Sequence, residues 1–450
     1  MKAEGRTIGD LIEPRREKAV PSEHPDLPYI GLEHIEAHST RLLGFVPATQ
    51  MRSTAKRFYS GDVLYSRLRP YLNKVWRADR DGLCSSEFIV MPGNDEIDSN
   101  FLRYRLNSSD FVRFANSLNA GDRPRVDFDQ ISSFALPTFS LPAQRAAVAE
   151  IEKQFTRLEA GVTALRRVQA KLKRYRAAVL KAACEGRLVP TEAELTKTGS
   201  RKTKFESSEA LLARILIARR KNWQGRGQYK EPGAADTTNL PPLPKGWTWA
   251  TLDALAGIKG GITKDQNRKH TAPARLVPYL RVANVQRGYL DLNEVKEIVT
   301  TEEEIRELAL KPGDILFNEG GDRDKLGRGW VWNDQLPECI HQNHVFRARR
   351  FDAALNPKLV SWYANTFGQQ FFFDEGKHTT NLASISMTKL RGLPVPIAPP
   401  AEQTRIVAEV ERRLSVVEEL EAVVSVNLQR ATRLRQSILA RAFSDGFNRE

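Results

Sequence analysis

The sequence has little cysteine and no long hydrophobic run. Its three cysteines, Cys84, Cys184 and Cys339, lie far apart and are odd in number, which argues against a disulfide framework and favours a reducing compartment. No apolar run approaches the roughly 20 residues that a membrane-spanning helix needs, and residues 1–5 lead into no signal-peptide core. These absences predict a cytoplasmic protein with no membrane partner.

Motifs for catalysis by this chain alone are also missing. Acidic residues between Asp314 and Asp324 stand beside Lys325, but Arg323 occupies the position where an Asp/Glu-x-Lys nuclease motif needs its acid. There is no Asn-Pro-Pro-Tyr motif for adenine methylation and no Walker sequence of a helicase. We therefore predict that the chain is not an enzyme and has no catalytic residues.

One stretch invites interpretation as a zinc site. Cys339, His341 and His344 lie close together in the sequence, and His378 follows at a distance. Structural zinc sites combine pairs of cysteines or histidines at short spacings, and no second cysteine pair stands at such a spacing here. We predict no metal site.

The composition predicts a basic globular protein. The chain has 450 residues, of which 41% are hydrophobic, and this length suits two or three domains. The net charge is +14 and the isoelectric point is near 9.7. A balance this basic favours a polyanionic partner, with DNA or RNA ahead of a membrane surface.

The stretch Leu141–Val189 occurs twice. With Gln144 set against Gln403, the two copies align without a gap, and each follows a Leu-Pro pair and a further proline. Self-similarity at a fixed offset has to be recognised before a fold is assigned. Identical pairs along the alignment include Glu150/Glu409, Glu159/Glu418, Arg174/Arg433, Arg176/Arg435 and Leu180/Leu439.

Both copies are predicted to be long helices with a coiled-coil seam, because apolar residues recur at alternating steps of about three and four. The first seam is Val148, Ile151, Phe155, Leu158, Val162, Leu165, Val168, Leu172, Tyr175 and Val179. The second is Val407, Val410, Leu414, Val417, Leu420, Val424, Leu428, Ala431, Leu434 and Ile438. Roughly 40 residues make a rod of about 60 Å. We expect the two rods to pair antiparallel within the chain; separate packing on their own domains is the alternative.

The remaining sequence repeats one globular plan. The strand predicted at Pro28–Leu32 matches Pro278–Val282, and the turn Gly61-Asp62 matches Gly313-Asp314. The predicted fold class is α/β (α+β), with two repeated globular domains separated by a pair of long antiparallel helices. The predicted boundaries are domain 1 at 1–140, spacer helix 1 at 141–189, a basic helix and linker at 190–246, domain 2 at 247–397 and spacer helix 2 at 398–450.

This arrangement resembles the specificity subunit of type I DNA restriction–modification enzymes. The resemblance covers essentially the whole chain. It rests on the Gly-Asp turns, the Leu136-Pro137 and Leu393-Pro394 pairs with Gln144 and Gln403, the stretch Leu180–Pro190, and Leu243–Trp247. One departure is that the second helix stops near Phe447 without the linker that follows the first.

The resemblance implies a subunit without catalysis or a cofactor of its own. Each globular half would be a target-recognition domain that reads one part of a bipartite, asymmetric sequence in double-stranded DNA. The helices would separate the halves and dock two modification (methyltransferase) subunits, which carry S-adenosylmethionine. Restriction (translocase and nuclease) subunits would complete the complex. At about 3.4 Å per base pair, a 60 Å rod spans at most roughly 18 base pairs.

Candidate DNA-contacting residues are cations, aromatics and amides in the variable loops, because arginine reads guanine edges or phosphates and amides read adenine. They are Arg67, Arg69, Tyr71, Lys74, Arg123, Arg125, Arg281, Arg323, Lys325, Arg328, Gln342, Asn343, His378 and Asn381. Solvated loops remain the alternative for each. Candidate partner-binding residues on the helices are Gln144, Glu150, Arg174, Arg176, Gln403, Glu409, Arg433 and Arg435. A coiled-coil scaffold that reads no DNA sequence remains the alternative function.

Overall fold

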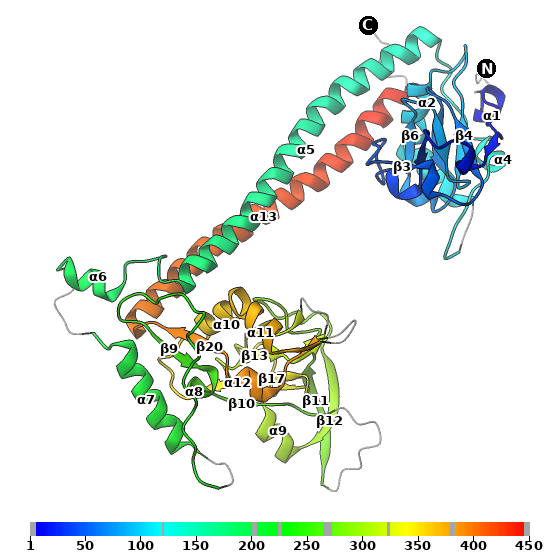
Figure 1. The fold of residues 1–450 in the computed structure, drawn as a ribbon. Helices are drawn as coiled ribbons and strands as arrows, with labels where there is room; N and C mark the ends of the chain where they lie inside the picture. Colours follow the sequence, from blue (N-terminus) through cyan, green and yellow to red (C-terminus); the bar gives the residue numbers. More distant parts are fainter. Residues whose placement is uncertain are drawn as a thin grey trace. The chain divides into compact units, whose positions relative to one another are not determined.

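The computed structural model describes residues 6–118, 121–199, 205–223, 227–263, 272–321, 325–378 and 383–444. The chain divides into two compact units (Figure 1). Each unit contains one globular domain together with a part of each of the two long helices. Unit 1 comprises Met1–Gln169 and Ala422–Glu450, and unit 2 comprises Ala170–Glu421. The predicted fold class, two repeated domains with a pair of long helices, is confirmed.

The described part of the unit 1 domain contains short strands and four short α-helices. A five-stranded sheet has the order β1-β4-β7-β2-β3, and a three-stranded sheet has the order β6-β5-β8. The strands are β1 (Lys18–Ala19), β2 (Pro28–Ile30), β3 (Val46–Pro47), β4 (Ala55–Phe58), β5 (Val63–Ser66), β6 (Val75–Arg77), β7 (Gly82–Cys84) and β8 (Phe88–Met91). The helices are α1 (Ile8–Leu11), α2 (Ser99–Leu106), α3 (Ser109–Ser117) and α4 (Phe128–Ile131).

The domain of unit 2 is larger. Its sheets have the orders β10-β17-β13-β15, β12-β11-β16, β14-β19-β18 and β20-β9. The strands are β9 (Thr248–Thr251), β10 (Ala256–Lys259), β11 (Ala274–Leu280), β12 (Lys296–Thr301), β13 (Ile315–Asn318), β14 (Gly320–Gly321), β15 (Gly329–Val331), β16 (Ile340–His341), β17 (Val345–Arg350), β18 (Lys377–His378), β19 (Ala383–Ser384) and β20 (Pro394–Ile397). The helices are α6 (Glu192–Lys197), α7 (Ser208–Lys221), α8 (Leu252–Leu255), α9 (Glu302–Leu308), α10 (Pro357–Thr366), α11 (Gly368–Glu375) and α12 (Met387–Arg391).

The two Gly-Asp turns adopt the same structure. Gly61 has φ +93° and Gly313 has φ +87°, a left-handed conformation that glycine adopts without a steric cost. The Asp62 carboxylate accepts a hydrogen bond from the Tyr59 amide at 2.9 Å, and the Asp314 carboxylate accepts one from the Lys311 amide at 2.7 Å. Each turn therefore starts the central strand of its domain, β5 or β13, in the same way.

The strand pairing around these turns is also repeated. Strand β5 lies between β6 and β8, and β13 lies between β15 and β17, all antiparallel. Strand β2 pairs in parallel with β7, as β11 does with β16. The predicted strands at Pro28 and Pro278 are thus confirmed as equivalents.

The long helices are α5 (Leu141–Cys184) and α13 (Pro400–Phe443), each of 44 residues. Proline suits the first turn of each because the amides there have no acceptor within the helix. Helix α5 ends in a Schellman motif, in which Arg187 N donates to Ala182 O at 2.9 Å and Gly186 has φ +65°. The left-handed Gly186 thus follows the last turn of the helix.

The predicted seam was wrong at four positions. Val168, Tyr175, Leu420 and Leu434 are exposed, whereas the other seam residues are buried or partly buried. A strict alternation of three and four steps instead passes through Arg176, Glu421 and Arg435, each one residue after an apolar neighbour. The sequence pattern favoured the apolar neighbour, but the position in the helix determines which side chain faces the other helix.

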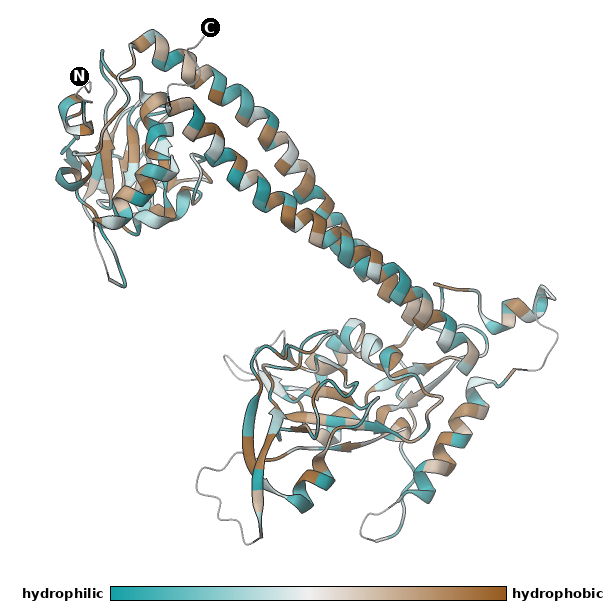
Figure 2. Ribbon diagram, turned by 180° about the vertical axis from the view of Figure 1, so that it is seen from behind, coloured by the Kyte–Doolittle hydropathy of each residue, from teal (hydrophilic) through white to brown (hydrophobic). Residues whose placement is uncertain are grey.

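The ends of the helices belong to the cores of the domains. In unit 1, Ile151 and Phe155 of α5 and Leu439 of α13 pack into the main core. In unit 2, Val179 of α5 and Val410 of α13 pack against tryptophans of the domain. Apolar residues recur along both helices (Figure 2). Among the described residues, no helix combines the length and the apolar character needed to span a membrane.

Candidate nucleic-acid interface and helix surfaces

In unit 1 the structure brings two candidate loops together. Residues 66–74 follow β5, and residues 121–127 precede α4. Backbone hydrogen bonds join them, from Arg69 N to Pro124 O at 2.8 Å and from Val126 N to Arg67 O at 2.9 Å. The candidates that thereby become neighbours are Arg67, Arg69, Arg123 and Arg125.

These cations differ in their partners. Arg67 forms an ion pair with Asp127, and Arg125 forms one with Glu87 at 2.7 Å. Arg69 is exposed and has φ +52° at the start of the turn Pro70–Leu72. Of the remaining candidates in these loops, Arg123 is exposed, Tyr71 is 42% exposed and Lys74 is half-buried.

Lys74 has an internal role. Its ammonium donates to the Leu32 carbonyl oxygen at 2.6 Å, and burial lowers its pKa. It ties residues 66–74 to the turn after β2. Arg69, Tyr71, Arg123 and the ion-paired Arg125 therefore form the exposed part of this candidate surface, while Lys74 supports it.

Unit 2 contains the same backbone frame with different side chains. Arg67 N donates to Glu87 O at 2.9 Å in unit 1, and Glu319 N donates to His344 O at 2.9 Å in unit 2. The bond from Val126 N to Arg67 O has its counterpart in the bond from Ile385 N to Glu319 O at 2.8 Å. We call these three hydrogen-bonded segments the loop frame. The frame holds 66–68, 85–88 and 124–127 in unit 1, and 318–320, 342–345 and 384–386 in unit 2.

The frame of unit 2 presents an acid and a histidine that the sequence did not mark as DNA-contact candidates. His344 Nδ1 lies 2.6 Å from the Glu319 carboxylate, and the histidine side chain is 55% exposed. Glu319 occupies the position of Arg67, and His344 occupies the position of Glu87. The signal that identifies them is their position after β13 and before β17, which the aligned Gly-Asp turn fixes.

The amide candidates of unit 2 lie in the turn between β16 and β17. Gln342 N donates to Leu280 O at 2.9 Å, and Asn343 N donates to Ile262 O at 2.9 Å. Both residues are partly exposed. Arg281 follows Leu280, is partly exposed, and contacts the Glu294 carboxylate at 3.4 Å.

The other candidates of unit 2 lie on or near the small sheet β14-β19-β18. Gly320 pairs with Ser384 and His378 pairs with Ala383, so the loops after β13 and after α11 are adjacent. Lys325 and Arg328 are partly exposed at the end of the first loop. Arg323, Asn381 and the side chain of His378 lie outside the described residues.

Two of the residues considered as zinc ligands, His341 and Cys339, support the strands instead. His341 is fully buried, its Nδ1 lies 2.7 Å from the Val345 carbonyl oxygen, and burial lowers its pKa to about 4. Cys339 is also buried, which raises its thiol pKa to about 12. Over the part of the chain that the structure describes, no group of three His, Cys, Asp or Glu side chains is placed to hold a metal ion.

Two of the candidate partner-binding residues are internal. The Gln144 side chain accepts from Asp98 N at 2.8 Å and donates to Phe139 O at 3.0 Å. The Gln403 side chain accepts from Asn356 N at 2.7 Å and donates to Ala398 O at 2.8 Å. Both glutamines are buried, so they join each helix to its own domain and are not part of an outer surface.

The candidates Glu150, Glu409, Arg174 and Arg433 lie along the outer faces of the helices, the arginines exposed and the glutamates partly so. Glu409 accepts from Arg412 and Arg413, which lowers its pKa to about 2. In unit 2, Arg176 crosses to the other helix and contacts Glu418 at 3.4 Å and Glu421 at 3.2 Å.

No family model matches the chain. It is 31% identical over 140 residues to the specificity subunit of the type I restriction enzyme EcoDI from Escherichia coli, which is 30% of this chain and 31% of that one. It is 26% identical over 191 residues to the EcoKI specificity subunit from Escherichia coli strain K12, which is 42% of this chain and 40% of that one. A solved chain from a study of assembly and conformational transition in the type I R-M system covers 99% of both chains, with a TM-score of 0.64 and 21% identity, and has the same fold.

The chain is thus similar to several type I restriction enzyme specificity subunits. The matched stretches span 31% and 40% of the two relatives' own lengths. In this chain the pair Arg435–Glu159, at 3.1 Å, is the repeat counterpart of Arg176–Glu418. The repeat seen in the sequence thus extends to the cross-helix ion pairs.

Proposed function

We propose that this chain is a type I specificity subunit and recognises a two-part DNA target, one part with each globular domain. The observation that carries the proposal is the loop frame. The same backbone hydrogen bonds present Arg67 and Glu87 in unit 1 but Glu319 and His344 in unit 2. Identical frames with unlike side chains suit two readers of different sequences.

The chemistry of the loops fits duplex DNA. Exposed Arg69 and Arg123 provide the fork-shaped donors that bind guanine edges or phosphates, and Gln342 and Asn343 provide amides that pair with adenine. A carboxylate such as Glu319 accepts from the cytosine amino group. The net charge of +14 adds a sequence-independent attraction to phosphates.

The long helices are the proposed docking surface for two modification subunits. Apolar side chains that the helix pair leaves exposed include Tyr175, Val416 and Leu420, and exposed apolar groups of this kind favour protein contacts. Because the helices are a repeat, they offer two similar surfaces to two copies of one partner. The partners would carry S-adenosylmethionine and methylate adenine, restriction subunits would cleave, and the complex would work in the cytoplasm.

Methylation mapping tests the proposal. Genomic DNA from the host, with and without this gene, is sequenced for methylated adenine. A split motif that is methylated in the parent and unmethylated in the deletion strain supports the proposal. Methylation that does not change on deletion favours the scaffold function instead.

A further inference from the structure

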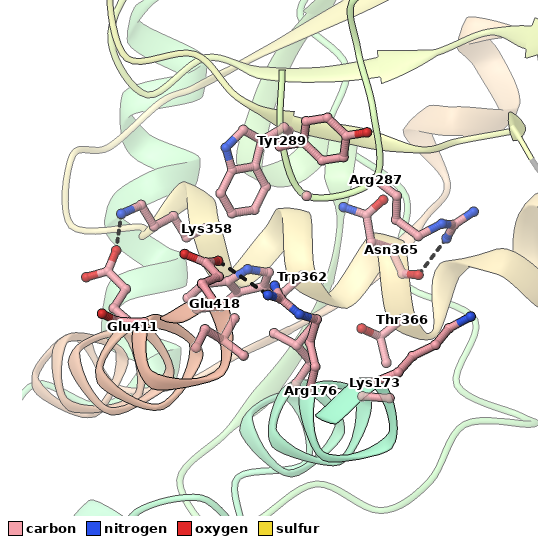
Figure 3. Close-up of a pocket in the computed structure, with 16 residues that line it drawn as sticks. Lys173, Arg176, Arg287, Tyr289, Lys358, Trp362, Asn365, Thr366, Glu411 and Glu418 are labelled. Atoms are coloured by element: carbon pink, nitrogen blue, oxygen red, sulfur yellow. Dashed lines mark hydrogen bonds and ion pairs between the residues drawn. The ribbon is translucent and has the colours of Figure 1, made fainter. Parts of the chain in front are cut away.

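A pocket of about 950 Å³ lies in unit 2, where α5 and α13 meet the domain (Figure 3). Its apolar wall includes the rings of Trp330 and Trp362, whose centroids are 6.3 Å apart, and Leu414 of α13. Tyr289, which is 57% exposed, stands at the edge. A cavity of this size lined by aromatic rings is typical of a binding site.

The repeat shows what fills the equivalent place in unit 1. Phe155 is the counterpart of Leu414 and Gln436 is the counterpart of Ala177. The Phe155 ring is 5% exposed and lies 3.9 Å below the Arg435 guanidinium. Gln436 donates to the Asn107 carbonyl oxygen at 3.3 Å. Large side chains therefore close the junction of helix and domain in unit 1.

Smaller residues leave the junction open in unit 2. Leucine at 414 and alanine at 177 reach less far than phenylalanine and glutamine. The Asn365 carbonyl oxygen, the counterpart of the Asn107 oxygen, accepts instead from Arg287 at 2.7 Å. The side chain of Arg176 is 33% exposed, whereas that of its counterpart Arg435 is 12% exposed. The pocket is therefore a difference between the two copies.

The charge of the pocket is unbalanced. Four cationic side chains and two carboxylates line the pocket. Both carboxylates form ion pairs, Glu418 with Arg176 and Glu411 with Lys358. The other two cations are Lys173 and Arg287. An apolar wall with surplus positive charge is complementary to an aromatic side chain that neighbours a carboxylate.

We infer that this pocket takes a segment of one modification subunit that carries an aromatic side chain beside an acidic one. The inference rests on the proposed function, since it names how one of the two partners is held. It implies that the two docking positions are unequal, because larger side chains occupy the equivalent positions of unit 1. The partner on unit 2 is bound more tightly, and assembly proceeds in two separate steps.

Native mass spectrometry of the full chain titrated with its modification subunit tests the inference. We expect two binding steps whose dissociation constants differ by at least about tenfold. The double variant Leu414→Phe with Ala177→Gln copies the residues of unit 1 and fills the pocket. It should weaken the tighter step about tenfold or more and leave the other unchanged.

Lys173→Glu reverses one positive charge of the pocket without filling it. It therefore tests the inference even if the double variant does not fold. It should weaken the same step, whereas Lys221→Glu on α7, outside the pocket, should weaken neither. Two equal steps in the parent chain, or a tight step that neither pocket variant alters, would overturn the inference while leaving the proposed function intact. A parent chain that binds no modification subunit would instead refute the proposed docking function and the inference with it.

Discussion

At the scale of residues, the exposed cations of unit 1 carry the clearest expectation for DNA binding. Arg69 and Arg123 are exposed on adjacent loops, whereas Arg67 and Arg125 are engaged with carboxylates of the same domain. Free guanidinium groups reach DNA without first breaking an internal ion pair. We therefore expect the first two to contribute more than the second two.

Arg69→Ala and Arg123→Ala should each weaken binding of the assembled complex to its target by about 1–3 kcal/mol if they contact bases. If they contact phosphates, they should reduce the slope of affinity against salt concentration by about one unit. Either effect should be confined to one half of the target. Fluorescence anisotropy with targets altered in one half measures this, and Arg52→Ala, an exposed cation outside both loops, is the control. A loss of modification-subunit binding would show that these residues were misassigned.

His341 predicts how stability depends on pH. Its pKa is lowered to about 4 by burial, so the unfolded chain, with a histidine pKa near 6.5, binds more protons between these values. Stability contributed by the neutral form is therefore present above pH 6.5 and is lost as the pH falls toward 4, by at most about 3 kcal/mol. His341→Gln should flatten this part of the profile in calorimetric unfolding from pH 7 to 4. Parallel profiles for the two proteins would contradict it.

At the scale of elements, the long helices were predictable and their contact faces only partly so. Apolar periodicity located α5 and α13. Where an arginine or glutamate occupies a seam position, however, the pattern assigns that position to the apolar residue beside it. Arg435 lies in the seam because its guanidinium covers the Phe155 ring and also reaches the Glu159 carboxylate. At such positions the apolar pattern selects the wrong residue, and only the structure of the helix pair shows which side chain is buried.

The two seam arginines should differ in their effect on stability. Arg435 is largely buried over an aromatic ring, so Arg435→Ala removes packing as well as charge and should cost about 2–3 kcal/mol. Arg176 lines the open pocket, where screening weakens its ion pairs, so Arg176→Ala should cost under about 1 kcal/mol. Denaturant unfolding of the two variants measures the difference. Equal losses would mean that the junction of unit 1 is no better packed than that of unit 2.

The candidate sites were the least predictable part. Loops 66–74 and 121–127 were each noticed for their cations, but nothing in the sequence joins them, since the bond from Val126 N to Arg67 O links residues far apart in the chain. Glu319 and His344 were considered only for a nuclease and a zinc site, because their place in the loop frame depends on the paired strands and is not visible in the sequence. Gln144 and Gln403 were noticed as a repeated pair, and the structure assigns them to joining helix and domain.

At the scale of the whole molecule, the length of the repeated helices should set the spacing of the two parts of the target. Removing the repeat-equivalent heptads 165–171 and 424–430 keeps both cross-helix pairs, Arg176–Glu418 and Arg435–Glu159. Each helix becomes about 10 Å shorter, which corresponds to roughly three base pairs. Methylation mapping should show a shorter spacer between unchanged half-sites. A spacer of unchanged length would refute a role of the helices in spacing.

The loop frame has a consequence for how such a molecule diversifies. Amides and carbonyls alone make its bonds, so any residue with a free N–H adopts the same path at positions 67 and 319. Selection can therefore exchange the outward groups while the fold is inherited without alteration. After a duplication, one lobe is free to acquire a new preference by single substitutions while its sister keeps the old one.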